Sequence, residues 1–376
     1  MAVWRHLATG IAVIAIPAVL AGCGVRPDTI RETSTPSEAT VLASTQRCSP
    51  ASTQIRVGGA GGSALLGLSD PELDRELGAA SAAGMFSVRV DIDWSAIEPV
   101  PGGPDWANTD RVINAVIAHG MCPLGLLGST PAWARDPSVG LENAHGRPAV
   151  PQVFAQFAAA AAQRYHDRIP IWEVWNEPNS VNFFAPAPNV DQYAQLLAAG
   201  YGSIKGVDPG AFVLSGGLAP AVDDGTDIAP VTFIRRMYEL GANKYFDAFA
   251  MHPYTHPALP DDPATAEWSS AQRMQQMRDV MVAGGDESKQ IWATEFGAPT
   301  GTGPGSVSDA VQAESIGTFL ATAADTSWIG PVYIFNIRDS GTDLADPEQN
   351  FGLLRYDFTP KPAYTVVTDF TRRTVN

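Results

Sequence analysis

The sequence has few cysteines, few histidines and few basic residues for its length of 376. It has 24 Lys and Arg residues and 40 Asp and Glu residues, which gives a net charge of −16. This balance, with no cluster of Lys or Arg, argues against a nucleic-acid partner, because phosphate binding needs clustered basic side chains. Three Cys are too few for a disulfide-stapled fold, and no C-x-x-C or H-E-x-x-H spacing predicts a metal site.

The N-terminal apolar run, Ile11–Leu20, is too short to span a membrane, which takes about 20 residues, and it contains Pro17. It ends in Leu20-Ala21-Gly22-Cys23, which resembles the lipobox of bacterial lipoproteins. The resemblance implies that residues 1–22 are a signal peptide and that Cys23 is lipidated. The protein would then be exported and lipid-anchored to the bacterial cell membrane, facing outward. An ordinary signal peptide with a chance Cys is the alternative.

Residues 23–50 are rich in Thr, Ser, Pro and Glu and have no hydrophobic periodicity. We interpret them as a flexible, disordered tether. Export would expose Cys48 and Cys122 to an oxidising compartment, where a bond between them would pin the end of the tether to the following domain. Two free thiols are the alternative, because spacing alone does not decide connectivity.

Residues 51–376 alternate short apolar runs with helical segments, and a composition of 45% hydrophobic and 17% charged residues allows a large core. Eight such alternations predict an α/β fold, a (β/α)8 TIM barrel in one domain. A doubly wound dinucleotide fold is less favoured, because no G-x-G-x-x-G follows the first strand. The predicted strands are Gln54–Gly58, Phe86–Asp93, Cys122–Gly128, Ile169–Trp175, Phe212–Gly217, Phe246–His252, Ile291–Glu295 and Pro331–Ile337; predicted helices include Pro71–Gly84, Val153–Tyr165, Gln192–Ile204 and Ala310–Asp325.

Two of these strands end in a carboxylate, Glu177 after the fourth and Glu295 at the end of the seventh. A carboxylate at the end of a strongly apolar run is costly unless it is paired or hydrogen-bonded, so its presence needs a reason. Side chains alternate between the two faces of a strand. Alternation therefore predicts that Glu177 shares a face of the fourth strand with Glu173 and Trp175. In the same way, Glu295 should share a face of the seventh strand with Ile291 and Ala293. If those faces point inward, the two carboxylates meet at one rim of the barrel, the arrangement that glycoside hydrolysis needs.

The motifs Trp175-Asn176-Glu177-Pro178 and Thr294-Glu295-Phe296-Gly297 resemble those of the retaining glycoside hydrolases of clan A, closest to family 39 and related cellulase-like families. The resemblance covers residues 51–376. It implies that Glu177 is the acid/base, that Glu295 is the nucleophile and that Asn176 binds the sugar 2-hydroxyl. It also implies carboxyl groups about 5–5.5 Å apart and retention of configuration.

Supporting residues follow other strands. Alternation places Arg89, Asp91 and Asp93 on one face, where Arg89 would hold a carboxylate ionised; a structural ion pair with Glu173 is the alternative for Arg89. Strand six is followed by His252 and Tyr254. The clan resemblance implies that Tyr254 orients Glu295 and that His252 contacts a sugar hydroxyl.

Aromatic platforms are expected, because sugars present apolar faces. The candidates are Trp94, Trp133 and the pair Phe183-Phe184, which follow the second, third and fourth strands. Among the tryptophans we favour Trp133. The eighth strand departs from the clan pattern, in which many members carry a Trp: here Phe335 takes that place, followed by Asn336 and by Arg338, which could bind an acidic sugar or lie in an exposed loop.

We therefore predict a retaining glycosidase that hydrolyses O-glycosidic bonds of a cell-envelope or extracellular polysaccharide or oligosaccharide. Its partners would be a carbohydrate substrate and, through Cys23, a membrane; we expect a monomer. Two carboxylates suffice for the chemistry, so we predict no cofactor and no metal ion. A non-catalytic sugar-binding lipoprotein with a barrel fold is the alternative function.

Overall fold

The computed structural model describes Cys48 and residues 56–374. The predicted signal peptide at 1–22, the lipidation site Cys23 and the tether at 23–50 lie outside the described residues, Cys48 excepted, and stay predictions. Among the helices of the described part, none combines the length and the apolar character needed to cross a bilayer.

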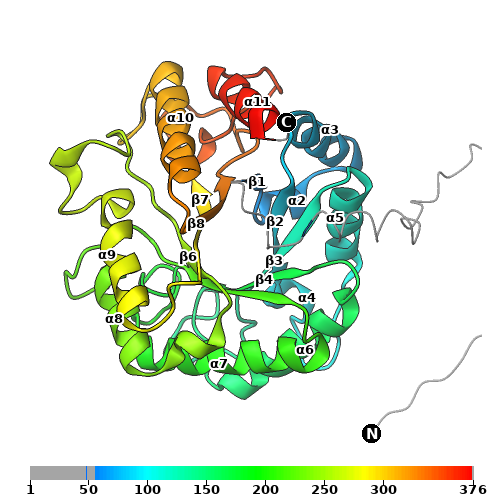
Figure 1. Ribbon diagram of the computed structural model, residues 1–376. Helices are drawn as coiled ribbons and strands as arrows, with labels where there is room; N and C mark the ends of the chain where they lie inside the picture. The colour runs from blue at the N-terminus through cyan, green and yellow to red at the C-terminus, as the bar shows by residue number, and fades with distance from the viewer. Residues whose placement is uncertain (1–47, 49–55, 375–376) are drawn as a thin grey trace, which may run out of the picture. The chain divides into compact units, whose positions relative to one another are not determined.

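Eight parallel strands form the centre of the fold (Figure 1). Their hydrogen-bonded order is β5-β4-β3-β2-β1-β8-β7-β6, and parallel bridges from Leu214 to Ala248 and from Leu218 to Met251 join the two ends into a barrel. The predicted (β/α)8 TIM barrel is confirmed. The strands are β1 (Val57–Ala60), β2 (Ser87–Asp93), β3 (Cys122–Gly128), β4 (Ile171–Asn176), β5 (Phe212–Gly217), β6 (Phe249–Met251), β7 (Ile291–Phe296) and β8 (Ile329–Ile334).

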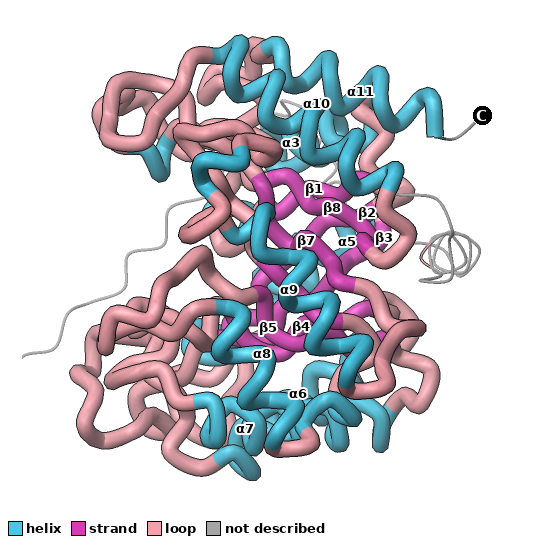
Figure 2. Tube along the Cα trace, turned by 60° about the vertical axis from the view of Figure 1, so that its left-hand side comes forward, coloured by secondary structure: helices cyan, strands magenta, loops and turns pink. Residues whose placement is uncertain are grey.

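Helices surround the strands, which occupy the interior in the side view (Figure 2). The last helix returns to the start of the barrel, where the Tyr364 hydroxyl donates to the Ala79 carbonyl. The helices are α2 (Ala64–Gly67), α3 (Asp70–Ala82), α4 (Trp94–Ile97), α5 (Ala107–Ala118), α6 (Pro151–Tyr165), α7 (Val190–Val207), α8 (Pro230–Glu239), α9 (Ser270–Ala283), α10 (Asp309–Asp325) and α11 (Pro362–Thr374), with 3-10 turns η1 (Ala242–Tyr245), η2 (Pro263–Thr265) and η3 (Pro347–Gln349).

Helix starts follow the local sequence. At α3, Ser69 and Glu72 form a capping box and Pro71 occupies the first turn, where its missing N–H costs nothing. At α10, the Ser308 side chain accepts the Val311 N–H. Each cap satisfies a backbone donor that the helix itself leaves open.

The alternation of the strands divides the apolar residues into two clusters. A large outer cluster between sheet and helices includes Val88, Val90 and Ile92 of β2. A small inner cluster fills the barrel with residues such as Leu124 and Ile171. Since the outward positions of β2 are apolar, its polar residues point to the inside, as predicted.

Strand β7 departs from the predicted alternation. Ile291 and Ala293 belong to the outer cluster, whereas Trp292 belongs to the inner one. The pairing of β7 with β8 shifts register both before and after Ala293. The prediction that Ile291 and Ala293 share the inward face with Glu295 is therefore wrong: the irregularity turns Glu295 toward the inside at the end of the strand.

A disulfide joins Cys48 to Cys122, with Cα atoms 5.7 Å apart, so of the two alternatives the structure has the bonded one. Cys122 is the first residue of β3, at the N-terminal end of the barrel. The bond therefore holds Cys48 at the end of the barrel opposite the carboxyl ends of the strands.

We expect Cys48→Ser to lower the free energy of unfolding by about 2–4 kcal/mol, because the bond closes a long loop in the unfolded chain. The sequence separation of the two residues is 74. Urea unfolding with and without reductant measures the effect. Reductant should destabilise the wild-type protein and leave the variant unchanged; equal stability of the wild-type protein in both conditions would contradict the bond.

Candidate active site

The carboxyl ends of the strands and the loops after them enclose a cavity of about 600 Å³. This volume lies within the range of about 300–1,000 Å³ that small-molecule sites occupy. Carboxylates, one guanidinium and several aromatic rings line it. Because barrel enzymes carry their active sites at this face, the cavity is the candidate active site.

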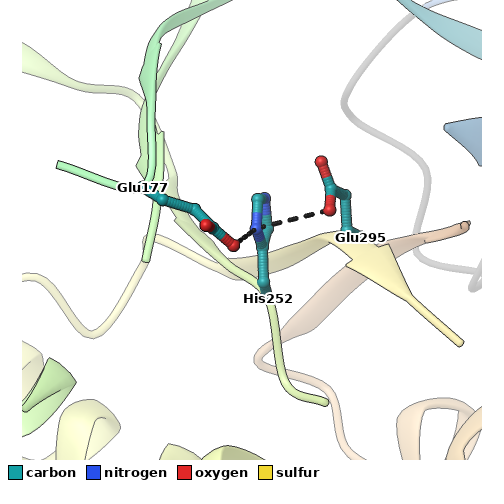
Figure 3. Close-up of side chains that lie close together, drawn as sticks. All are labelled: Glu177, His252 and Glu295. Carbon is teal, nitrogen blue, oxygen red and sulfur yellow. Dashed lines mark hydrogen bonds and ion pairs between the residues drawn. The ribbon is translucent and has the colours of Figure 1, made fainter. Parts of the chain in front are cut away.

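The structure brings Glu177 and Glu295 together at this cavity, with His252 between them (Figure 3). One oxygen of each carboxyl group and one nitrogen of His252 lie within 4.8 Å of one another. The Nδ1 atom of His252 is 2.8 Å from Oε1 of Glu177 and 3.6 Å from Oε2 of Glu295. The two carboxylates, 118 residues apart in the chain (295 − 177), thus face the same space.

The backbone at the end of β4 places Glu177. Trp175 and Glu177 have φ angles of 75° and 46°, in the left-handed region, and the Glu177 N–H donates to the Gly217 carbonyl at 2.9 Å. Trp175 packs in the outer cluster against Phe154. The prediction that Trp175 shares the inward face with Glu177 is therefore wrong, because the unusual φ angles break the alternation.

A glycine is required beside this turn. A Cβ atom on Gly217 would lie 2.2 Å from Nε2 of His252. Any side chain at position 217 would therefore displace the imidazole from its place between the two carboxylates.

Arg89 bonds to three other residues of the site. Its Nε is 2.6 Å from Oε2 of Glu173, its Nη1 is 2.6 Å from Oε1 of Glu295, and its Nη2 donates to Oδ1 of Asn176 at 2.7 Å. Both alternatives for Arg89 are present together: it pairs with Glu173 and also contacts the proposed nucleophile. Because the guanidinium takes Oδ1 of Asn176, the Nδ2 group of Asn176 is the one left to donate elsewhere.

Glu173 completes this network from inside the barrel. Its side chain is fully buried, and its Oε1 accepts the Gly217 N–H at 2.9 Å and the Thr294 hydroxyl at 3.1 Å. A buried carboxylate with so many donors is fully satisfied, so it serves as a fixed acceptor for Arg89.

The environment keeps Glu295 ionised. Burial by itself would raise the pKa of this carboxyl, but the positive charges of His252 and Arg89 and hydrogen bonds from Tyr254 and Arg89 outweigh it and lower the pKa below its usual value. The Tyr254 hydroxyl donates to Oε2 at 2.9 Å. Burial and the nearby carboxylates raise the pKa of Tyr254 well above its usual value, so it stays a donor.

His252 is fully buried and is absent from the cavity lining, so the structure favours a contact with the carboxylates over the predicted contact with a sugar hydroxyl. Burial lowers the pKa of the imidazole, but the charge of Glu295 and the hydrogen bond with Glu177 more than offset this and raise it. A protonated ring donates from Nδ1, which suits its place between two carboxylates.

Of the two aromatic residues most favoured to contact the sugar, Phe335 and Trp133, only Phe335 lines the cavity. Its ring centroid lies 5.1 Å from that of Phe351, which lines the cavity as well. Trp133 lies outside the cavity lining: 37% exposed, it packs its ring against Trp94 and donates to the Glu98 carbonyl.

Arg338 fulfils neither of its two predictions. It is buried, forms an ion pair with Glu76 at 2.8 Å and stacks on the rings of Tyr356 and Phe358. Apolar rings and a buried carboxylate thus hold it in the packing of the chain, and it is not among the cavity-lining residues.

Of the candidate platform residues after the fourth strand, Phe183 lines the cavity. Other lining residues were not assigned to the site from the sequence, among them Asp91, His145, Glu348 and Phe351. For Asp91 the signal was present, because alternation already placed it on the face of Arg89. The other three lie in loops, whose courses no periodicity predicts.

Asp91 lines the cavity from the middle of β2, whereas the side chain of the neighbouring Asp93 caps α4. Burial raises the pKa of Asp91 to about 7, helped by the nearby Asp93 and Glu295 and opposed by Arg89. Besides Glu177 and Glu295, the cavity therefore contains a carboxyl group, that of Asp91, whose pKa lies near neutrality.

Glu177, His252 and Glu295 also have the spacing of a metal site, since each offers one ligand atom within the 4.8 Å limit given above. Two carboxylates and one imidazole are ligands that divalent transition metals accept. They are the described residues that could hold a metal ion.

Solved structures share this fold. A family 39 glycoside hydrolase from Bacteroides cellulosilyticus WH2 matches with a TM-score of 0.66 and 23% identity over 85% of this chain, but the chain spans only 64% of that protein. A monomeric beta-xylosidase from Caulobacter crescentus CB15 matches with a TM-score of 0.65 and 16% identity, covering 85% of this chain and 68% of that one.

A third match is GH5_18 from Streptomyces cattleya in complex with GlcNAc, with a TM-score of 0.63 and 19% identity, covering 86% of this chain and 81% of that one. The chain has a glycoside hydrolase-like barrel fold. No protein-family model matches the sequence. At these identities the likeness extends to the fold, and function has to be argued from the site.

Asp91 allows a test of the electrostatics of the cavity. Its pKa is 3.8 in an unfolded chain and about 7 in the fold. The folded protein therefore binds more protons than the unfolded chain between these values, and its stability falls as the pH rises through this window. We expect Asp91→Asn to gain stability relative to the wild-type protein, by on the order of a few kcal/mol between pH 4 and pH 8.

Urea unfolding of both proteins at each pH measures this difference, in which the other titrating groups cancel. The exposed Asp261→Asn variant is a control for the removal of one carboxyl outside the cavity lining. A difference between Asp91→Asn and the wild-type protein that stays constant with pH would contradict the assignment.

Proposed function

We propose that the protein is a retaining glycosidase, with Glu177 as acid/base and Glu295 as nucleophile. The observation that carries the proposal is the pair of facing carboxylates, one of which Arg89 and Tyr254 hold as an anion. Their oxygens lie within 4.8 Å, which is consistent with the separation of about 5–5.5 Å in retaining enzymes and shorter than the roughly 6.5–9.5 Å of inverting ones.

In the first step, an oxygen of Glu295 attacks the anomeric carbon and the bond to the leaving oxygen breaks. Glu177 gives its proton to that oxygen, so the leaving group departs as a neutral alcohol. Oε1 of Glu177 is held by His252, so Oε2 is the oxygen available for this transfer.

In the second step, Glu177 takes a proton from water while the water oxygen bonds to the anomeric carbon. The bond from carbon to Glu295 breaks, and its electron pair returns to the carboxylate. Both oxygens of Glu295 then recover their donors, Arg89 on Oε1 and Tyr254 on Oε2, which stabilise the released anion.

The remaining residues orient the sugar. The free Nδ2 group of Asn176 suits a hydrogen bond to the 2-hydroxyl, an interaction that strengthens as the transition state forms. Phe335 offers an apolar wall on the cavity. Trp133 stands outside the cavity lining, so we propose it as a platform only for a substrate long enough to extend beyond the cavity.

As substrate we propose an O-linked polysaccharide or oligosaccharide of the cell envelope or the extracellular space. A sugar ligand in one structural match and xylosidase activity in the name of another support a carbohydrate. Export and lipidation at Cys23 remain a proposal from the lipobox resemblance, as does the monomeric state.

We expect Glu177→Gln and Glu295→Gln each to lower kcat/KM by at least about 100-fold, because each removes a proton donor or a charged nucleophile while keeping the side-chain shape. Release of reducing sugar from envelope glycans and of the aryl group from a panel of aryl glycosides measures activity. The exposed Glu267→Gln variant serves as the control, with circular dichroism to verify folding. Full turnover in either site variant would refute its role.

A second test separates catalysis from sugar binding. A 2-deoxy-2-fluoro glycoside should leave a covalent adduct on Glu295, detectable by mass spectrometry, and azide should partly restore activity to Glu295→Ala and not to Glu177→Gln. Sugar binding with neither turnover nor adduct would replace the proposal with the non-catalytic sugar-binding protein.

A further inference from the structure

Two rings stack on one wall of the cavity. His145 lies in the loop after β3 and Phe183 in the loop after β4, and both line the cavity. Their ring centroids are 4.7 Å apart, with the planes inclined by 26°. Neither ring has a role in the chemistry described above, so this aromatic pair needs another explanation.

Hydrogen bonds between the two loops hold the pair in place. The Ala185 N–H donates to the His145 carbonyl at 3.3 Å, and the Arg147 N–H donates to the Ala185 carbonyl at 3.0 Å. Nδ1 of His145 is 3.2 Å from the Asn182 carbonyl, and the Trp175 indole N–H donates to the Phe183 carbonyl at 2.8 Å. A surface fixed in this way is preformed for a ligand.

Phe183 belongs to the same loop as the acid/base. From Glu177 the chain reaches Phe183 through two successive turns, in which the Ser180 N–H donates to the Glu177 carbonyl and the Phe183 N–H to the Ser180 carbonyl. The rings of Phe335 and Phe351, by contrast, pack around Tyr254, the residue bonded to Glu295. The chain thus joins one aromatic group of the cavity to Glu177, and packing joins the other to the partner of Glu295.

This placement assigns the two sides of the substrate. The acid protonates the oxygen that departs, so the leaving group lies beside Glu177, and the reacting sugar lies over Glu295. An apolar ring face beside Glu177 suits the apolar face of a second sugar.

We propose that the stacked rings of Phe183 and His145 form the platform for the sugar ring of the leaving group. The inference rests on the proposed glycosidase function and names the part of the cavity that binds the leaving group of such a saccharide. Phe183 is then a specificity-determining residue that acts in the step forming the glycosyl-enzyme.

The test compares substrates that share the reacting sugar and differ in the leaving group. A panel of β-glycosyl fluorides of glucose, galactose, mannose, xylose and N-acetylglucosamine selects the sugar, and fluoride carries no ring to stack. The comparison substrates, whose leaving group carries a ring, are the disaccharides and the 4-methylumbelliferyl glycoside of the selected sugar. Each substrate is assayed with the wild-type protein, Phe183→Ala, Phe183→Tyr and the control Trp268→Ala, which removes an exposed ring outside the cavity lining.

We expect Phe183→Ala to lower kcat/KM for the ring-bearing substrates by about 3- to 10-fold, the value of one aromatic contact, and to leave kcat/KM for the fluoride within about twofold. Phe183→Tyr, which keeps the ring, should hydrolyse the ring-bearing substrates and the fluoride at close to the wild-type kcat/KM. Trp268→Ala should change neither.

Equal losses on fluoride and ring-bearing substrates would overturn the platform, because they would indicate a disturbed site. No loss on either substrate would overturn it as well. A wild-type protein that hydrolyses no fluoride and forms no adduct with the fluorosugar would instead remove the proposed function, and the platform with it.

Discussion

The guanidinium of Arg89 is a buried positive charge on which the geometry of the cavity depends. It bonds Glu173 on β4 and Glu295 on β7, strands on different sides of the barrel, and it also fixes Asn176. Breaking a buried ion pair of this kind costs about 3–5 kcal/mol, because the remaining charge is left without a partner. A single side chain from β2 therefore sets the positions of two residues on β4 and one on β7.

The charges around Arg89 explain the place of His252. One guanidinium beside the two carboxylates Glu173 and Glu295 leaves one negative charge in a buried region. Since an uncompensated buried charge is expensive, a protonated imidazole next to Glu295 and Glu177 is favoured there. The close approach of His252 is possible because position 217 is a glycine. The electrostatics of the site thus depend on a backbone position that has no side chain.

The sequence predicted the barrel because the spacing of apolar residues and the length of each segment are properties of the local sequence. The apolar runs at Phe86–Asp93 and Cys122–Gly128, for example, correspond closely to β2 and β3. The residues at strand ends, Glu177 and Glu295, were found because a carboxylate beside an apolar run is conspicuous. The reasoning about faces succeeded for Arg89 on the regular strand β2. It failed for Trp175 and for Ala293, where positive φ angles and a shifted register change the direction of the side chains.

These failures have a common physical cause and occur at the site itself. A strictly alternating strand directs every second side chain inward, so a catalytic group at its end takes whatever direction the pleat gives it. At Glu177 and Glu295 the backbone leaves the pleat, and both carboxyl groups turn toward His252. The Glu173 network secures this, because its bonds to Gly217 and Thr294 tie β4 to the ends of β5 and β7. Local departure from regular structure is stable here because the regular barrel around it is closed and its buried polar groups are bonded.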